Sequence, residues 1–265
     1  MSAKGLALYA VREELAREPD RTLERVADIG FTGVEPFGLG DPSLYRGERL
    51  TKAKLLRRGI ERADLSVSSA HTKFPLPSEM DWLLEELAIV GVPIALASIP
   101  EHVLGYGRDV LASMSGIQRF AEHFGLLAER AAEHGVRIGY HNHWWDWPRL
   151  PDGTHGYDRF IEALDPEIVV ELDLYWAHTA GQDLPQLLNR LGDRVRLVHF
   201  KDGPGLAEDP LADQVPLGLG GADLDGALSA LPNQLEWALV ELDRTSLDPF
   251  RVVADGYSWL TARGI

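Results

Sequence analysis

Histidine and carboxylate side chains recur at the ends of strand-like segments in the second half of the sequence. The stretch GYHNHWWDWP places His141 and His143 on the same side of an extended chain, because strand side chains alternate with a period of two. Asp173 ends the apolar run IVVELD, and His199 and Glu241 stand near the ends of two later runs, VRLVHF and WALVEL. Imidazole and carboxylate groups together form a ligand set for divalent metals.

The repetition of this pattern favours a metal or catalytic site. A single histidine at the end of an apolar strand is more often a buried structural residue with satisfied hydrogen bonds. Here four consecutive strand-like segments each supply one candidate, and side chains that converge in this way indicate a metal or catalytic centre. The four candidates are His141, Asp173, His199 and Glu241. Their two imidazoles favour one Mn²⁺, Zn²⁺, Co²⁺ or Fe²⁺ ion over Mg²⁺.

These residues require a scaffold that brings strand ends together, and the order of the expected elements supplies one. Strand-like segments alternate with amphipathic helical segments, which favours right-handed parallel βαβ units. The strand-like segments are residues 5–9, 33–37, 65–70, 93–99, 136–143, 168–173, 195–200 and 237–242. Eight such units match an α/β fold, a (β/α)8 TIM barrel, with residues 1–265 as a single domain. A doubly wound open sheet is the alternative, but no G-x-G-x-x-G turn follows the first segment.

Helices are expected between the strands, and several carry recognisable ends. The later ones are expected at residues 113–134, 156–164, 184–191, 223–231 and 248–259. Three earlier helices are expected to begin at the N-caps Asp20, Thr51 and Ser78. Asp81, three residues after Ser78, would complete a variant of the capping box. In such a barrel the active site lies at the face where the strands end.

Further polar and aromatic residues stand at or near the expected strand ends. Glu35 and His71 follow the second and third segments, and each is either a substrate contact or a buried, hydrogen-bonded residue of the barrel rim. Lys201, in the sequence HFKD, is interpreted as a pocket lysine, with a surface position as the alternative. Trp144 and Trp176 are either core residues or flat surfaces on which the apolar face of a sugar would stack.

The loop after the seventh strand offers one weak indication of an anion site. Asp202 is expected either to start this loop or to hold Lys201. Gly218, Gly220 and Gly221 form a turn before a helix, where backbone N–H groups would suit a phosphate. Three glycines in a loop are a common feature, so this indication carries little weight.

Composition limits the classes of partner. The net charge of −15 disfavours nucleic acid, because an acidic surface repels a phosphate backbone. The sequence contains no cysteine, which excludes a thiolate nucleophile and thiolate-bound zinc. The N-terminal segment turns charged too early for a signal peptide, and no apolar stretch is long enough for a transmembrane helix. We therefore expect a cytoplasmic protein without a membrane partner.

Seven segments resemble the sugar phosphate isomerase/epimerase family, whose members share a xylose-isomerase-like barrel. They are GVEPFG, SSAHT, GYHNHWWDW, VVELDLYWAHTAGQD, LVHFKDG, VPLGLGGADL and WALVELD, and they extend through nearly the whole chain. The resemblance implies a (β/α)8 barrel with one divalent metal ion, held by residues of the last four strands that are commonly Glu, Asp, His and Glu. Matched residue by residue, these positions are His141, Asp173, His199 and Glu241.

Two positions depart from the ketose 3-epimerases of that family. His141 replaces the glutamate that those epimerases use, with a second carboxylate, to pass a proton across a carbon. Trp176 stands where they have a substrate-binding histidine. The sequence is instead similar to the branch of the family that carries the motif YHNH, whose substrates are less uniform.

The resemblance implies an enzyme that acts beside a carbonyl group of a keto-sugar, sugar phosphate or cyclitol. Isomerisation, epimerisation and dehydration all begin with removal of a proton from carbon, and a metal would stabilise the resulting enediolate. Glu241 would bind the metal and exchange the proton, with His141 or His143 as its acid–base partner, and Lys201 would stabilise negative charge. The expected substrate contacts are Glu35, His71, Trp144 and Trp176.

Two other classes of function stay open from the sequence. The same barrel occurs in AP endonucleases, which hydrolyse phosphodiesters with three zinc ions. A non-catalytic sugar-binding barrel is the other alternative. A small sugar or polyol is the expected partner in the favoured reading, and the resemblance allows a homo-oligomer.

Overall fold

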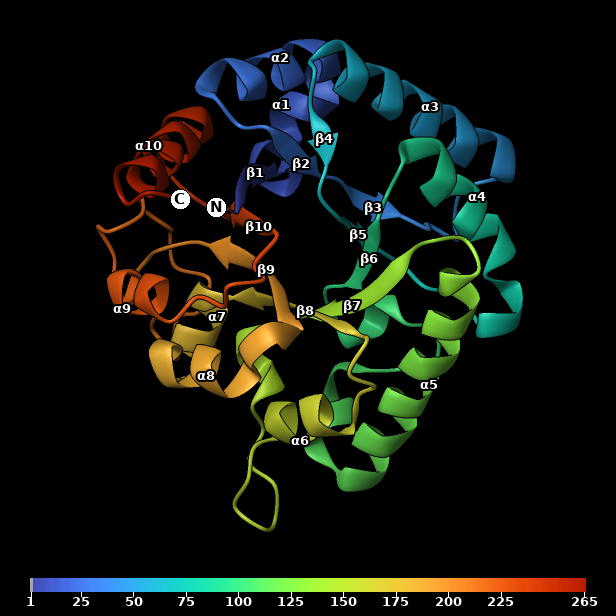
Figure 1. The fold of residues 1–265 in the computed structure, drawn as a ribbon, viewed down its shortest axis with the longest axis vertical. Coiled ribbons are helices and arrows are strands. Elements are labelled where there is room, and N and C mark those ends of the chain that lie inside the picture. Colours follow the sequence, from blue (N-terminus) through green and yellow to red (C-terminus); the bar gives the residue numbers. More distant parts are fainter. Residues whose placement is uncertain (1) are drawn as a thin grey trace.

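A parallel β-sheet closed into a ring forms the centre of the molecule (Figure 1). The computed structural model describes residues 2–265. The strands are β1 (Ala3–Ala7), β2 (Gly33–Glu35), β3 (Phe37–Leu39), β4 (Ser66–Val67), β5 (Ala70–Thr72), β6 (Ile94–Ala97), β7 (Arg137–His141), β8 (Val169–Asp173), β9 (Val195–Phe200) and β10 (Trp237–Val240). Their order is β3-β5-β6-β7-β8-β9-β10-β1-β2-β4, and all paired neighbours run parallel.

The second strand of the barrel consists of β2 and β3, and the third consists of β4 and β5, so the strand order begins and ends within these two strands and the ring is closed. Pro36 separates β2 from β3, since proline lacks the N–H that a continuous ladder needs. β2 pairs with β4 and β3 pairs with β5, so the two interrupted strands lie side by side along their length. The described residues therefore form the eight-stranded barrel that the sequence predicts, and the doubly wound alternative is wrong.

Helices surround the ring on its outside (Figure 1). They are α1 (Arg12–Arg17), α2 (Pro19–Ile29), α3 (Arg46–Arg62), α4 (Asp81–Val90), α5 (Met114–Ala132), α6 (Gly156–Ala163), α7 (Leu174–Thr179), α8 (Leu184–Leu191), α9 (Leu224–Ser229) and α10 (Pro249–Ala262). Short 3-10 helices are η1 (Leu8–Val11), η2 (Pro77–Glu79), η3 (Pro100–His102), η4 (Arg108–Ala112), η5 (Trp144–Asp146) and η6 (Gly192–Arg194).

Helix α5 illustrates how the sequence produces these elements. The Ser113 side chain accepts a hydrogen bond from the Gly116 N–H at 3.1 Å and so caps the first turn. Ile117, Phe120 and Phe124 lie on one stripe and are fully buried against the sheet. The spacing of apolar residues thus determines which face of the helix packs on the barrel.

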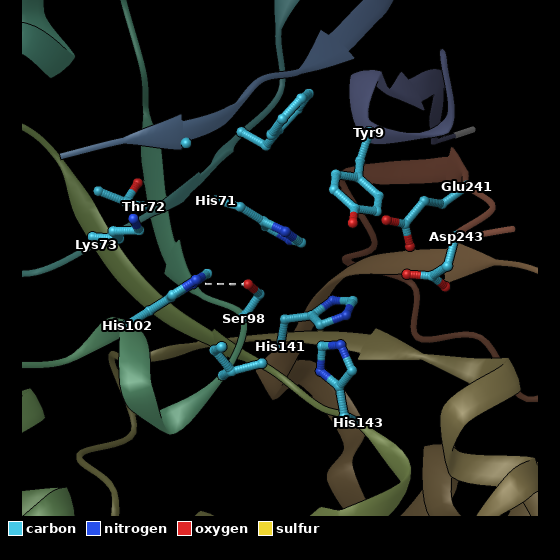
Figure 2. A pocket seen from close by; sticks show the side chains of 13 residues that line it. Tyr9, His71, Thr72, Lys73, Ser98, His102, His141, His143, Glu241 and Asp243 are labelled. Carbon is cyan, nitrogen blue, oxygen red and sulfur yellow. Dashed lines mark hydrogen bonds between the residues drawn. The ribbon is translucent and has the colours of Figure 1, made fainter. Parts of the chain in front are cut away.

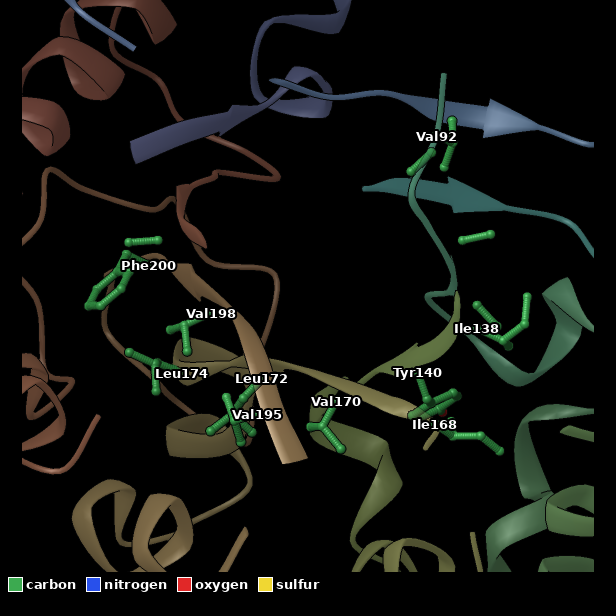
Figure 3. Close-up of a cluster of buried hydrophobic side chains, with 14 of the residues drawn as sticks. Val92, Ile138, Tyr140, Ile168, Val170, Leu172, Leu174, Val195, Val198 and Phe200 are labelled. Carbon is green, nitrogen blue, oxygen red and sulfur yellow. The ribbon is translucent and has the colours of Figure 1, made fainter. Parts of the chain in front are cut away.

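Two apolar layers result from the alternation along the strands. Residues facing outward pack beneath the helices, as Ile138, Tyr140, Val170, Leu172, Val198 and Phe200 do in Figure 3. A smaller cluster fills the interior of the barrel and consists of Ile94, Leu96, Val169, Leu197 and Leu239, with Trp237 against it. The positions that follow this inner cluster along the same strand faces carry the polar residues of the site.

Most expected elements are confirmed, but three helix starts and several strand ends are wrong. Helix α2 begins at Pro19 rather than after Asp20, and α3 begins at Arg46, so that Thr51 lies inside it and donates to the Gly47 carbonyl at 2.7 Å. Ser78 lies in η2 and makes no cap for α4, whose N-cap residue is Met80.

The remaining differences concern short elements. β1, β6, β7 and β10 each end two residues earlier than expected, and η5 begins at Trp144 soon after the end of β7. Helices α1 and α7 were not expected from the sequence. A run of six residues offers too few helical repeats to reveal a period.

The ends of the described chain lie close together (Figure 1). The Lys4 ammonium donates a hydrogen bond to the main-chain carbonyl of Ile265. None of the helices formed by residues 2–265 has both the length and the apolar character needed to cross a lipid bilayer.

Candidate metal and substrate site

Four strands direct a double layer of polar side chains into the barrel at its C-terminal face. On β8, Glu171 and Asp173 are two residues apart and both point inward. On β9 and just beyond it, His199 and Lys201 are related in the same way. The Glu241 N–H donates to the Phe200 carbonyl at 3.1 Å, which places Glu241 at the end of β10.

The four residues expected to hold a metal lie together. One donor atom from each of His141, Asp173, His199 and Glu241 lies within 4.8 Å of the others, and all four residues are buried. His199 Nδ1 is 2.9 Å from Glu241 Oε2, and His141 Nε2 is 3.7 Å from Asp173 Oδ2. This buried cluster could bind a divalent ion, and two of its members, His141 and Glu241, also line the cavity above it.

Asp173 is oriented by its local structure. Its Oδ1 accepts a hydrogen bond from the Trp176 N–H at 2.8 Å and so caps α7. The Asn142 side chain bonds both the N–H and the carbonyl of Asp173, at 2.9 and 3.1 Å, which ties the end of β7 to the end of β8. Among the described residues, Oδ2 of Asp173 has no aligned hydrogen-bond donor, although Lys201 Nζ is 2.8 Å away. An acceptor left in this state fits a cation ligand.

A second set of carboxylates lies behind the histidines. Glu171 Oε2 is 3.0 Å from His141 Nδ1 and 2.8 Å from His71 Nε2. Glu35 Oε1 is 3.0 Å from His199 Nε2 and 3.2 Å from His71 Nε2, and Ser69 donates to the other oxygen of Glu35 at 2.5 Å. Each metal-facing histidine therefore has its second nitrogen against a carboxylate, which fixes the ring and the tautomer.

These contacts distinguish two overlapping candidate groups. His71, His141, Glu171 and His199 also place donor atoms within 4.8 Å of one another. That deeper group, however, would use the nitrogens of His141 and His199 that already face Glu171 and Glu35. The group with Asp173 and Glu241 leaves those contacts intact, so it fits an ion better.

The Lys201 ammonium is buried among three carboxylates. Its Nζ lies 2.8 Å from Asp173, 2.5 Å from Glu241 and 2.7 Å from Asp243. Burial lowers the pKa of Lys201, but the charges of Asp173, Asp243 and Glu241 outweigh it and raise that pKa well above its usual value. Lys201 is therefore a fixed positive charge beside the metal-binding group. It is 1% exposed, so the surface alternative is wrong, but it lies outside the lining of the cavity above the cluster.

Burial and neighbouring charges separate the protonation states of the cluster. Burial lowers the pKa of His141 to about 3 and that of His143 well below its usual value, so both imidazoles are neutral. Burial also lowers the pKa of His199, but the charges of Glu171, Glu35 and Glu241 outweigh it and raise the pKa well above 6.5. The His199 proton and the Lys201 ammonium offset part of the negative charge of the surrounding carboxylates.

The pKa values of the carboxylates Asp173 and Glu241 also differ, because burial and neighbouring charges act on them to different extents. Burial raises the pKa of Asp173 to about 6 despite the nearby Lys201. Burial would also raise the pKa of Glu241, but Lys201 and His199 hold it well below 4.5. Glu241 is therefore ionised at neutral pH.

A cavity of about 340 Å³ opens directly above the cluster (Figure 2). Four of the predicted site residues line it, namely His71, His141, His143 and Glu241. Residues that were not predicted also line it, among them Tyr9, Lys73, Ser98, His102 and Asp243. Figure 2 shows Lys73 and His102 on one side of this cavity and Glu241 and Asp243 on the other.

The residues Trp144, Trp176 and Glu35, which were expected to contact a substrate, do not line this cavity. Trp176 is only 1% exposed, and its ring lies 5.8 Å from that of His143 and 4.6 Å from that of Trp144. Lys201 Nζ lies 5.0 Å above the Trp176 ring. Trp144 is partly exposed. Trp176 thus packs against His143 and Lys201. Glu35 is 2% exposed and contacts His71 and His199.

The glycine-rich loop has an internal acceptor for its N–H groups. The Asp202 carboxylate accepts from the N–H groups of Gly203, Gly218 and Gly220 at 2.9–3.0 Å and from that of Ala222 at 3.3 Å. Asp202 therefore organises the loop and does not hold Lys201. Because its carboxylate occupies this position, the structure does not support the weak phosphate indication there.

Two important residues were missed in the sequence, although a signal for both was present. Glu171 lies two residues before Asp173, and Asp243 lies two residues after Glu241. The period of two that placed His141 beside His143 applies equally to these pairs. Glu171 was overlooked because it stands within the apolar run IVVELD, which indicates a strand and draws attention to its last residue.

Comparison with known families agrees with this geometry. The model of the family described as xylose isomerase-like TIM barrel matches residues 23–263. The chain belongs to this family. Its structural neighbours include a sugar phosphate isomerase/epimerase from Parabacteroides distasonis, 22% identical, with a TM-score of 0.78 and coverage of 100% of this chain and 95% of the other. A probable 3-DHS dehydratase from Bacillus anthracis, 14% identical, has a TM-score of 0.74 and is matched over the whole of both chains. At these identities the likeness shows the fold alone.

Curated relatives carry the name inosose dehydratase. The one from Mesomycoplasma hyopneumoniae strain 7448 is 23% identical over 199 residues, which is 69% of this chain and 62% of that protein. The chain thus matches less than two thirds of the length of that relative. Proteins that resemble this chain in sequence or fold thus carry the names of enzymes, among them an inosose dehydratase, a probable 3-DHS dehydratase and an L-ribulose 3-epimerase.

Proposed function

We propose that the protein is a divalent-metal-dependent enzyme that removes and returns a proton at a carbon beside a carbonyl group of a sugar, keto-sugar or cyclitol. The observation that carries the proposal is the convergence of His141, Asp173, His199 and Glu241 below a cavity at the C-terminal face of the barrel. Isomerisation, epimerisation and dehydration share this first step, and they differ in what the resulting carbanion does next. Residues 1–265 would act as one barrel domain.

The ligand set decides the class of ion and the chemistry that it adds. Two imidazoles and two carboxylates suit Mn²⁺, Zn²⁺, Co²⁺ or Fe²⁺ better than Mg²⁺. When bound, such an ion would act as a Lewis acid toward the carbonyl oxygen and stabilise negative charge there. Lys201, buried beside Asp173 and Glu241, would add a fixed positive charge.

Two side chains suit the proton transfers. Glu241 is ionised and lines the cavity, so it can accept a proton from carbon. His141 has Glu171 against one nitrogen and the metal-binding group against the other, which leaves no nitrogen free for a substrate. His143 is neutral and lines the same cavity, so we assign it, rather than His141, as the partner acid–base group.

The charges around the cavity favour an unphosphorylated substrate. Lys201 is already paired with three carboxylates, and Asp243 and Glu241 line the cavity wall. The loop N–H groups that would suit a phosphate are bonded to Asp202. A neutral polyol with a carbonyl group avoids repulsion by these carboxylates.

Solvent isotope exchange tests the proposal. The protein is reconstituted with Mn²⁺ or Zn²⁺ and incubated in D₂O with ketoses, keto-glycosides and inososes. Proton NMR and mass spectrometry then detect deuterium at the carbon beside the carbonyl group or loss of water. Glu241→Gln, which retains a ligating oxygen, is the control and should exchange about 10²–10⁴ times more slowly.

Metal content separates the alternatives. One tightly bound ion per chain agrees with the proposal, whereas three zinc ions with phosphodiesterase activity would indicate an AP-endonuclease-like hydrolase. Tight sugar binding without isotope exchange or loss of water in any substrate would indicate a non-catalytic sugar-binding barrel.

A further inference from the structure

A second cavity adjoins the one above the metal-binding group. The first has a volume of about 340 Å³ and the second about 400 Å³. Lys73 and His102 belong to the walls of both. In Figure 2 these two residues lie on the side of the first cavity opposite Glu241 and Asp243, so the second cavity extends away from the metal-binding group.

The lining of the second cavity suits a ring that carries hydroxyl groups. Trp82, Phe74 and Leu104 provide apolar surface, on which the C–H face of a sugar can pack. Glu79 and Glu101 provide acceptors at its edge. Sites for small ligands combine apolar walls with a few polar groups in this way.

Arg49 gives this second cavity a fixed donor. Its side chain is 8% exposed, lines the cavity and lies 4.2 Å above the Trp82 ring. Its Nη1 donates to the Leu44 carbonyl at 2.8 Å, and Glu86 lies 3.8 Å from its Nε. Among the described residues, that buried Nε has no hydrogen-bond partner. The guanidinium is thus held in place at the cavity wall, where it presents a fixed positive charge to a ligand.

The junction between the cavities is also ordered. His102 Nδ1 lies 3.0 Å from the Ser98 hydroxyl, and this contact is drawn in Figure 2. Burial lowers the pKa of His102 to about 4, so the ring is neutral at pH 7 and offers no charge to repel or attract a substrate. Lys73 stands beside it and is partly exposed. A neutral imidazole and a flexible amine are suitable partners for the oxygen that links two rings.

We infer that the second cavity is a subsite for a second ring, and that the substrate is a glycoside or disaccharide whose reacting sugar occupies the first cavity. The inference rests on the proposed function and narrows its substrate class from free sugars to sugars joined to another ring. A monosaccharide would fill the first cavity and leave Arg49 and Trp82 without a ligand.

Filling the second cavity tests the inference. Leu104→Trp places a large ring at its edge, and Leu104 is 52% exposed, so the fold should tolerate the change. Leu126→Trp is the matched control, because Leu126 is also 52% exposed but lies on α5 outside both cavities. Trp82→Leu removes the stacking surface and provides a second, independent variant, with its fold checked by circular dichroism.

Affinity is measured by calorimetry for a keto-disaccharide and the corresponding keto-monosaccharide, with metal-loaded protein. In the unmodified protein, the two-ring ligand should bind at least about tenfold more tightly than the one-ring ligand. Leu104→Trp and Trp82→Leu should each remove most of this ratio, and Leu126→Trp should leave it unchanged. Equal affinities in the unmodified protein, or a ratio that survives both cavity variants, would overturn the inference.

Isotope exchange with the same ligands separates this inference from the proposed function. Exchange into the monosaccharide without a two-ring preference would retain the function and reject the second subsite. A two-ring preference that the cavity variants remove, without exchange into any ligand, would retain the subsite and reject the proposed chemistry.

Discussion

The most direct test of the site concerns Glu171, which binds no ion in the arrangement proposed here. Its Oε2 lies against Nδ1 of His141 and Nε2 of His71, and its Oε1 is 3.3 Å from Nε2 of His199. Glu171→Gln keeps the size of the side chain. It replaces one accepting oxygen with an NH₂ group, which cannot accept a hydrogen bond from an imidazole. At least one of the three rings then loses its acceptor.

The expected effect is a loss of metal affinity without a loss of ligands. Replacing a carboxylate that orients a metal-binding histidine typically costs about 10–100-fold in affinity, or about 1.4–2.7 kcal/mol. We expect the upper part of this range, because Glu171 contacts both His141 and His199. Competition with a fluorescent chelator measures the affinity for Zn²⁺ or Mn²⁺ directly and requires no substrate.

A buried carboxylate elsewhere provides the control. Glu86 is 3% exposed, accepts from the Gly40 N–H at 3.1 Å and belongs to neither group of possible metal ligands. Glu86→Gln should leave metal affinity unchanged even if it lowers stability. Unchanged affinity in Glu171→Gln would refute the supporting role. A loss far above 100-fold, matched by a similar loss in His71→Ala, would instead make Glu171 a ligand of the deeper group.

Other predictions follow from the same geometry. Asp173→Asn should weaken metal binding, and excess metal should partly restore its turnover, whereas metal should not restore Glu241→Gln, which lacks the base. Metal affinity should rise with pH, measured by titration between pH 5 and 8, because His199 must lose a proton and Asp173, with a pKa near 6, must ionise. Asp146 has its pKa raised by burial from 3.8 to about 7, so the folded state holds its proton more tightly than the unfolded state does. Its contribution to stability should therefore fall between pH 4 and 7, by at most about 4 kcal/mol, and thermal melts of Asp146→Asn should lack this decline. Asp202→Ala should cost about 1–3 kcal/mol and speed hydrogen exchange at the glycine loop, since it leaves several N–H groups without their acceptor.

The sequence predicted the barrel and the grouping of four candidate metal ligands because both depend on local periodicity. A strand of five or six residues has a definite end, and a parallel barrel brings all such ends to one face. His141, Asp173, His199 and Glu241 could therefore be grouped without any knowledge of distances. β9 and α8 were predicted to the residue because their apolar periods are uninterrupted.

Other features depend on contacts that no local pattern records. The N-cap residues Thr51 and Ser78 were misplaced because a serine or threonine also occurs within or between helices, where its hydroxyl bonds other groups. The second cavity is formed by loops after β3, β5 and β6 together with α3 and α4, whose residues lie far apart in the sequence. Trp82 in particular lies on a helix, and its place beside Arg49 arises only when α3 packs on α4.

Glu171 and Asp173 show how environment, rather than residue type, divides roles within one strand. Both are carboxylates, both face the barrel interior and both are fully buried. Burial alone would raise both pKa values, but the nearby histidines hold that of Glu171 well below 4.5, whereas that of Asp173 rises to about 6. Glu171 lies against three imidazoles, although its Oε1, like Oδ2 of Asp173, has no aligned hydrogen-bond partner among the described residues. Asp173 has one oxygen committed to capping α7, and its Oδ2 faces Lys201 and the side chains of His141 and Glu241. The positive charge of an ion would therefore change the surroundings of Asp173 more than those of Glu171, and this difference supports the proposal that an ion would bind beside Asp173 and Glu241 rather than in the deeper group.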